Sequence, residues 1–227
     1  MLNDLGETIT GRQVWFFSCD EKEDRAYHLT DWLGAARIKK RSEIGFPSFV
    51  KQLCKVAHKL ADMHDAGYVH GDIQPDHFLI DDSGKVYLLD LALAHEPGSS
   101  FAYKGAFIPF VSPEIATGML GAELMMDGPK LLCLLQSDVF SFGAMAYYLF
   151  TGKQQANLDR YANELMKTKL CHIIVGGPHS FDYNEEYSEQ ADALANVIRE
   201  CMKRHPNCRP DMRQVGNRLS RIYVETV

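Results

Sequence analysis

The chain has 227 residues, of which 46% are apolar, and this fits one domain of ordinary size or two small lobes. A net charge of −6 and a pI near 5.8 argue against a general nucleic-acid or membrane-surface binder. No apolar run reaches the ~18 residues of a membrane span. Met1 to Glu7 lack the basic start of a signal peptide, and the six cysteines show no C-x-x-C spacing. We therefore expect a cytoplasmic protein with reduced, mostly buried thiols.

The first third of the chain contains two candidate strands and then a change of period. Residues 13–18 and 26–33 read as strands, separated by a charged turn at 19–24. Residues 35–41 are predicted to form a short basic helix, which would leave Lys39 and Lys40 as exposed helix charges. From Phe46, apolar residues recur at intervals of three and four, which predicts a helix to His64 that Gly67 ends.

A hairpin is predicted directly after this helix. Residues 78–80 and 86–89 are short apolar runs, and Asp81-Asp82-Ser83-Gly84 is a turn signal between them. Asp72 precedes the first run and Asp90 follows the second, so the hairpin would bring both carboxylates to the same end. Such a pair can orient a hydroxyl group and hold a divalent metal ion.

The remainder of the chain reads as mostly helical. Residues 96–110 look like loop, and past residue 92 no further strong strand pattern is visible. A new segment starts at Ser112. A nearly all-apolar, buried helix is expected from Ser137, its predicted cap, to Gly152. Residues 191–203 and 211–223 are predicted to be amphipathic helices.

These segments resemble the motifs of protein kinases, in the same order. His70-Gly71-Asp72 and Asp90-Leu91-Ala92 resemble the catalytic HRD and metal-binding DFG loops. Ser112-Pro113-Glu114 resembles the APE motif, residues 137–143 resemble the start of the central kinase helix, and residues 201–210 resemble the C-x-x-x-x-P-x-x-R-P segment. The resemblance implies an α+β protein-kinase-like fold, with a mostly helical C-lobe at 35–227 and a reduced β N-lobe and hinge at 1–34.

The resemblance also implies roles for individual residues. Asp72 would take the proton of the acceptor hydroxyl, and Asp90 would hold the metal that bridges the ATP phosphates. Adenine would lie against Leu79 and against a hinge formed by Asp31, Trp32 and Leu33. Structural support would come from His70, from Asp138 below the catalytic loop, and from a buried ion pair between Glu114 and Arg209.

Several positions depart from the family pattern. The sequence contains no G-x-G-x-x-G loop and no strand lysine in a VAIK-like context before the hinge. Gly71 replaces the arginine of the HRD motif, and Gln74 replaces the lysine that touches the transferred phosphate. His77 replaces the asparagine that holds the second metal. It is either a lost ligand or a ligand that suits softer ions than magnesium.

The stretch between Glu114 and Asp138 is longer than in the family and is rich in Met and Leu. Residues 119–135 are therefore either an apolar docking surface for a protein partner or an extra helix packed on the body.

Three functions stay open. The first is an atypical protein kinase that transfers the γ-phosphate of ATP, with Mg or Mn, to a protein Ser or Thr hydroxyl. The second is a pseudokinase that acts as a binding or scaffold module. The third is a small-molecule phosphotransferase, which His70-Gly71-Asp72 allows but Ser112-Pro113-Glu114 and Arg209 argue against. No nucleic-acid or membrane partner is expected.

Overall fold

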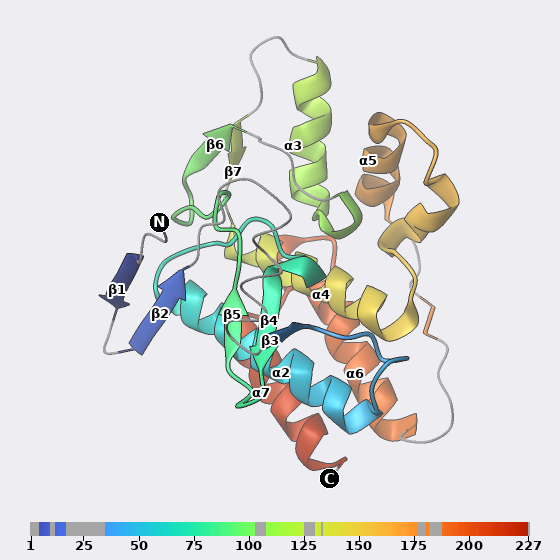
Figure 1. Cartoon of the computed structure of the whole chain (residues 1–227). Helices are drawn as coiled ribbons and strands as arrows, with labels where there is room; N and C mark the ends of the chain where they lie inside the picture. The colour runs from blue at the N-terminus through green and yellow to red at the C-terminus, as the bar shows by residue number, and fades with distance from the viewer. Residues whose placement is uncertain are drawn as a thin grey trace.

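A computed structural model describes residues 5–9, 12–16, 35–102, 108–124, 130–132, 134–176, 180–181 and 188–226, and its body is helical. Four helices share the main core (Figure 1): α2 (Phe46–Asp65), α4 (Leu135–Thr151), α6 (Ser188–Cys201) and α7 (Met212–Val224). Helices α3 (Pro113–Leu124) and α5 (Met166–Val175) contribute to a second, smaller apolar cluster. The predicted helical C-lobe is confirmed. No helix in these ranges is both long and apolar enough to cross a bilayer.

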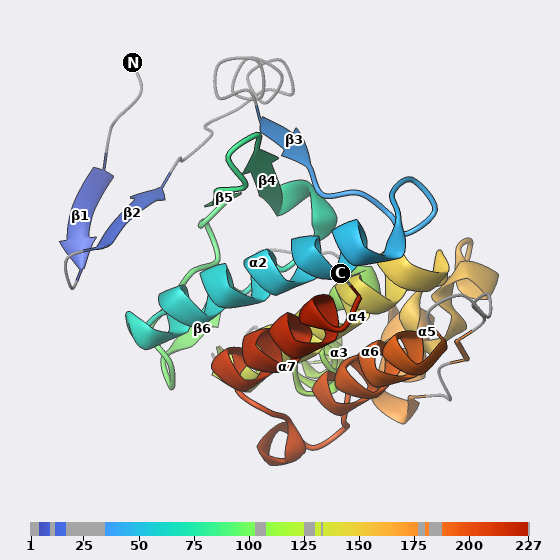
Figure 2. The same cartoon turned by 90° about the horizontal axis from the view of Figure 1, so that it is seen from below.

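The strands form three small antiparallel sheets. The central sheet has the order β3-β4-β5, with β3 at Ala35–Arg37, β4 at Phe78–Asp81 and β5 at Val86–Leu88. Figure 2 shows this sheet on one side of α2 and α7 on the other. The two remaining sheets are hairpin β1–β2 (Leu5–Ile9, Arg12–Phe16) and pair β6–β7 (Ser100–Ala102, Lys130–Leu132).

Helix α2 forms where the apolar period predicts it. Its buried stripe includes Phe49, Leu53, Val56 and Leu60, all fully buried. Pro47 in its first turn needs no intrahelical partner, and Gly67 follows the helix with φ +86°. This helix therefore fixes the place at which the segment carrying Asp72 begins.

Three predictions about local structure are wrong. Residues 35–37 are a strand rather than a basic helix, because Ala35 and Ala36 pair with Asp81 and Ile80 of β4. Lys39 and Lys40 accordingly follow a strand and lie in a stretch without regular secondary structure. Residues 96–110 are not all loop, and strands do occur after residue 92, because β6 pairs with β7.

Three further predictions need correction. Helix α4 begins at Leu135, with Leu134 as its N-cap, so Ser137 is not the cap. The hydroxyl of Ser137 instead donates to Glu114 Oε1 at 2.7 Å.

The thiols of Cys171 and Cys208 are free but exposed, whereas burial raises the pKa of the Cys201 thiol to about 12. Helix α6 starts three residues earlier than predicted, and Asp211 caps α7 through a capping box with Gln214.

The shorter turns complete the layout of the body. They are four 3₁₀ segments: η1 (Pro75–His77), η2 (Ile108–Phe110), η3 (Gln155–Tyr161) and η4 (Pro206–Cys208). Segment η1 directly precedes β4 and carries His77, so it leads the chain into the β4–β5 hairpin.

Candidate functional site

The β4–β5 hairpin brings the two predicted aspartates together. Leu79 pairs with Tyr87 and Phe78 with Leu88, so the chain enters and leaves the hairpin at the same end. Asp72 lies before that end and Asp90 after it. One candidate ligand atom from each of Asp72, His77 and Asp90 lies within 4.8 Å of the other two. The predicted juxtaposition of the carboxylates is present, and an imidazole joins it.

Asp72 and His77 are held against each other by the tight turn of η1. His77 Nδ1 lies 2.8 Å from the backbone oxygen of Asp72 and 3.5 Å from its Oδ2. The side-chain amide nitrogen of Gln74, Nε2, donates to the same Oδ2 at 2.9 Å. The carboxylate of Asp72 therefore has a neutral donor where the family has a lysine, and its side chain is 14% exposed.

Asp90 is the more exposed partner, at 53% of its side chain. Its φ of +54° lies in the left-handed region, which aspartate tolerates better than most residues. Its Oδ1 accepts from the backbone N–H of Ala92 at 3.2 Å, and its Oδ2 lies 3.8 Å from His77 Nε2. The second carboxylate is thus turned toward the imidazole.

A buried carboxylate supports this loop from below, as predicted for Asp138. Its Oδ2 accepts from the backbone N–H of His70 at 2.7 Å, and its Oδ1 from that of Gly71 at 2.9 Å. Burial alone would raise the pKa of Asp138, but the hydrogen bond and charge of His64, with the Gly71 N–H, outweigh it and lower the pKa below its ordinary value. The loop is therefore tied to the first turn of α4.

His64 has a part in the site that was not predicted. Its Nε2 donates to Asp138 Oδ2 at 3.0 Å, although no pattern in the sequence separates it from ordinary histidines. The only signal was its place at the end of the α2 stripe. His70 is fully buried, as expected for a packing residue, and burial lowers its pKa. Its ring stacks against those of His77 and Phe78, with centroids 6.0 and 6.3 Å away.

The predicted ion pair between Glu114 and Arg209 is present and extensively hydrogen-bonded. Nη1 and Nη2 of Arg209 donate to Oε1 and Oε2 of Glu114 at 2.7 and 2.9 Å. The other three N–H groups donate to the backbone oxygens of Gln136, Arg204 and Lys203. All five guanidinium donors are therefore used, which only arginine can provide. The pair fixes the start of α3 against the η4 segment.

Other predicted residues lie differently. Asp31, Trp32 and Leu33 fall outside the described residues. Leu79 is 2% exposed and packs with Ala35 and Tyr87, so the position predicted to contact adenine is buried within the β3-β4-β5 sheet. Its contact with adenine stays a prediction.

The segment at 119–135 is neither a separate helix nor, where described, a free apolar surface. Its first part lengthens α3, in which Met119 is 1% exposed and packs with Leu170 and Ile173 of α5. A later part is β7. Met125 and Met126 lie outside the described residues. A role in partner binding therefore stays a prediction for the rest of the stretch.

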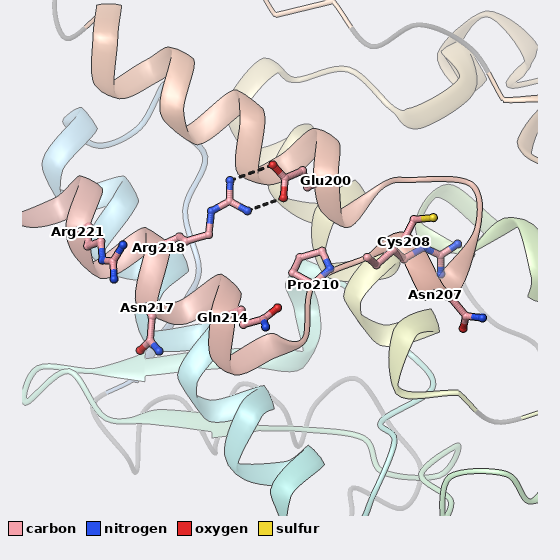
Figure 3. Close-up of a pocket in the computed structure, with 9 residues that line it drawn as sticks. Glu200, Asn207, Cys208, Pro210, Gln214, Asn217, Arg218 and Arg221 are labelled. Atoms are coloured by element: carbon pink, nitrogen blue, oxygen red, sulfur yellow. Dashed lines mark hydrogen bonds and ion pairs between the residues drawn. The ribbon is translucent and has the colours of Figure 1, made fainter.

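A separate pocket of about 480 Å³ lies where α6, α7 and η4 meet (Figure 3). Arg218 reaches across it to Glu200, with N–O distances of 2.6 and 3.2 Å. Its lining includes Arg209, already paired with Glu114, and none of the three candidate metal ligands. Because two of its three arginines are neutralised by carboxylates, the candidate functional site remains the Asp72–His77–Asp90 cluster.

The donor set of this cluster fits a divalent cation. Two carboxylates and one imidazole converge, and the carboxylates carry the negative charge that a metal-bound nucleotide site needs. Asp90 and His77 are the residues that would hold the ion. When bound, the ion would neutralise phosphate charge. Asp72, next to the ion, would orient the acceptor hydroxyl group.

Comparisons with known proteins agree with this architecture. The model of the protein kinase domain family matches residues 20–218. Sperm motility kinase 3A of Mus musculus is 27% identical over 154 residues, 67% of this chain and 26% of the relative. The dual specificity protein kinase TTK of Mus musculus is 26% identical over 207 residues, 87% of this chain and 22% of the relative. The leaf rust 10 disease-resistance locus receptor-like protein kinase-like 1.4 of Arabidopsis thaliana is 22% identical over 173 residues, 71% of this chain and 24% of the relative.

The chain thus spans about a quarter of the length of these relatives. The match to the family model includes both candidate aspartates, the Asp138 brace and the Glu114–Arg209 ion pair. This chain belongs to the protein kinase domain family.

Proposed function

We propose that this domain binds ATP with a divalent metal ion and transfers the γ-phosphate to a Ser or Thr hydroxyl of a protein. The observation that carries the proposal is the convergence of Asp72, His77 and Asp90 within 4.8 Å. Phosphoryl transfer needs mainly positioning and charge stabilisation, and a metal ligand and a hydroxyl-orienting carboxylate contribute to both.

The support around the cluster favours the same function. The loop that carries Asp72 is tied to α4 by two backbone hydrogen bonds to Asp138, so the carboxylate is held by packed structure. A protein rather than a small-molecule acceptor is favoured by the Glu114–Arg209 ion pair, since the resemblance ties this pair to the end of the activation segment.

A pseudokinase that binds partners without transferring phosphate is the second candidate. Gly71, Gln74 and His77 stand where the family has arginine, lysine and asparagine. Losing a single preorganised charge-stabilising group costs about 10²–10³ in rate, and this chain lacks more than one. Metal-dependent ATP binding with no transfer would be the signature of this alternative.

Transfer of labelled γ-phosphate from ATP to a mixture of casein and histone tests the proposal, with Mg²⁺ and Mn²⁺ in separate reactions. Asp72→Asn is expected to lower the rate at least about 100-fold, because it removes the proton acceptor. Asp76→Asn is the matched control, since Asp76 is 58% exposed and pairs with Arg37 outside the cluster. Incorporation that is equal in the wild type and Asp72→Asn would refute phosphotransfer by this site.

A further inference from the structure

The hydrogen bond between His77 and Asp72 determines which ring nitrogen of His77 carries a lone pair. Nδ1 lies 2.8 Å from the backbone oxygen of Asp72, and a carbonyl oxygen can only accept. In the neutral imidazole the proton is therefore on Nδ1, and Nε2 is an acceptor. A hydrogen bond from one ring nitrogen to a carbonyl is the usual arrangement of a histidine whose other nitrogen binds a metal.

Nε2 faces a second acceptor. Asp90 Oδ2 lies 3.8 Å away, beyond the ~3.2 Å limit of an N–H···O hydrogen bond. Two lone-pair atoms directed at each other repel unless a proton or a metal ion lies between them, and 3.8 Å is too long for a shared proton. Metal–ligand bonds of about 2.0–2.2 Å put two ligands of one ion roughly 3–4.4 Å apart. The separation between these two atoms therefore suits a shared ion.

The chemistry of the ligands determines which ion. Mg²⁺ prefers an octahedron of oxygen atoms, often including several waters, and gains little from an imidazole. Divalent ions of the first transition series accept imidazole nitrogen together with carboxylate oxygen. The asparagine found at this position in the family would offer an oxygen, whereas His77 offers nitrogen.

We infer that His77 Nε2 is a metal ligand and that it shifts the preference of this cleft from Mg²⁺ toward a transition-series dication such as Mn²⁺ or Co²⁺. The inference deepens the proposed function, because it concerns the metal of the same cleft, but metal binding can be measured without ATP or phosphate transfer.

The test is a titration of the nucleotide-free domain with Mn²⁺. The EPR signal of the free ion monitors binding, and Mg²⁺ is added as the competitor. The wild type is expected to bind Mn²⁺ at a site that equal concentrations of Mg²⁺ do not empty. His77→Asn is expected to weaken Mn²⁺ binding at least about tenfold, because it removes the nitrogen ligand. His205→Asn, a change in an exposed loop, controls for adventitious binding by surface histidines.

Unchanged Mn²⁺ affinity in His77→Asn, no Mn²⁺ binding by the wild type, or equal displacement by Mg²⁺ would each overturn the inference. A thermal melt of each variant shows that it is folded before it is titrated. If His77→Asn binds Mn²⁺ normally while Asp90→Asn loses metal–ATP binding and transfer, the inference fails and the proposed function stands. If the wild type holds Mn²⁺ through His77 but transfers no phosphate, the inference stands and the proposed function fails.

Discussion

Gly71 shows how one residue of the catalytic loop is determined by backbone geometry. Its φ is +81°, and a Cβ atom added there would lie 2.6 Å from the backbone oxygen of Leu93. The departure from the family's arginine therefore matches the space available, because a side chain would meet backbone that cannot move easily. Glycine also lets the N–H of this residue reach Asp138 Oδ1.

Gly71→Ala is expected to destabilise the domain through both effects. A left-handed φ costs a residue with a Cβ atom about 1–2 kcal/mol, and overpacking against Leu93 typically adds about 1–3 kcal/mol. Gly98→Ala is the control, because Gly98 has φ +80° but nothing within 4 Å of an added Cβ. Urea denaturation should show a larger loss for Gly71→Ala. Equal losses would show that the approach to Leu93 costs nothing.

The Glu114–Arg209 ion pair should make stability depend on pH. Burial tends to raise the pKa of Glu114, but the hydrogen bonds and charge of Arg209, with Ser137, lower it below the ordinary value of 4.5. Because the folded-state pKa of Glu114 is lowered, the ion pair contributes fully to the free energy of unfolding above about pH 4.5. This contribution is lost as the pH falls through the folded-state pKa.

Glu114→Gln should therefore cost about 3–5 kcal/mol at pH 7, because it leaves a buried guanidinium unpaired. The difference from the wild type should shrink below pH 4.5. Glu200→Gln is the matched control, since Glu200 also pairs with an arginine but is 39% exposed, and surface pairs contribute about 0–1 kcal/mol. Denaturation midpoints at pH 7, 5, 4 and 3.5 measure both variants. A similar cost for the two would contradict the structural role of the buried pair.

At the scale of elements, the contact of α4 with α6 depends on Gly143. A Cβ atom there would lie 2.7 Å from Cys201 Cβ, 2.8 Å from Met202 Cγ and 3.3 Å from Ile198 O. The two helices can therefore approach closely only because this position has no side chain.

Gly143→Ala is expected to lower stability, because overpacking of about 1–3 kcal/mol outweighs a gain in helix propensity of up to about 1 kcal/mol. Gly121→Ala in α3 makes the same change where nothing lies within 4 Å of the new atom, so it should be neutral or stabilising. Melting temperatures of the two variants compare these effects directly. A stabilised Gly143→Ala would mean that α4 and α6 can separate at little cost.

The elements also show what the sequence could predict. Helix α2 was predictable because its apolar residues repeat with a helical period over 20 residues, a pattern that is visible without knowledge of any other segment. Strand β3 was not, because three residues become a strand only by pairing with β4, more than forty positions later. The same holds for β6 and β7, which pair across the whole of α3.

The site was partly predictable for the same reason. Asp72, Asp90 and Asp138 could be placed because hairpin geometry and the family motifs are local in sequence. The role of His64 depends on a distant contact with Asp138. The same limit applies outside the site to Gln155, which is buried and donates to the backbone oxygens of Pro109 and Val111, contacts that no pattern around residue 155 indicates.

At the scale of the whole molecule, a helical body holds a cluster of metal-ligand type at the end of a short hairpin, and it is the one such cluster among the residues that the structure describes. The Asp138 brace and the Glu114–Arg209 pair position the segments on either side of that cluster. ATP binding at this cluster should therefore depend on the metal ion and should need Asp90.

The most direct measurement is a thermal melt with and without ATP, in Mg²⁺ and then Mn²⁺, for the wild type, Asp90→Asn and Asp76→Asn. ATP at 100 times its dissociation constant should stabilise by about 2.7 kcal/mol, and each kcal/mol raises the midpoint by ~2–4 °C in a chain of this size. The expected result is a metal-dependent rise of roughly 5–11 °C that Asp76→Asn keeps and Asp90→Asn loses. No rise in either metal, or the same rise in Asp90→Asn, would refute metal-dependent ATP binding through Asp90.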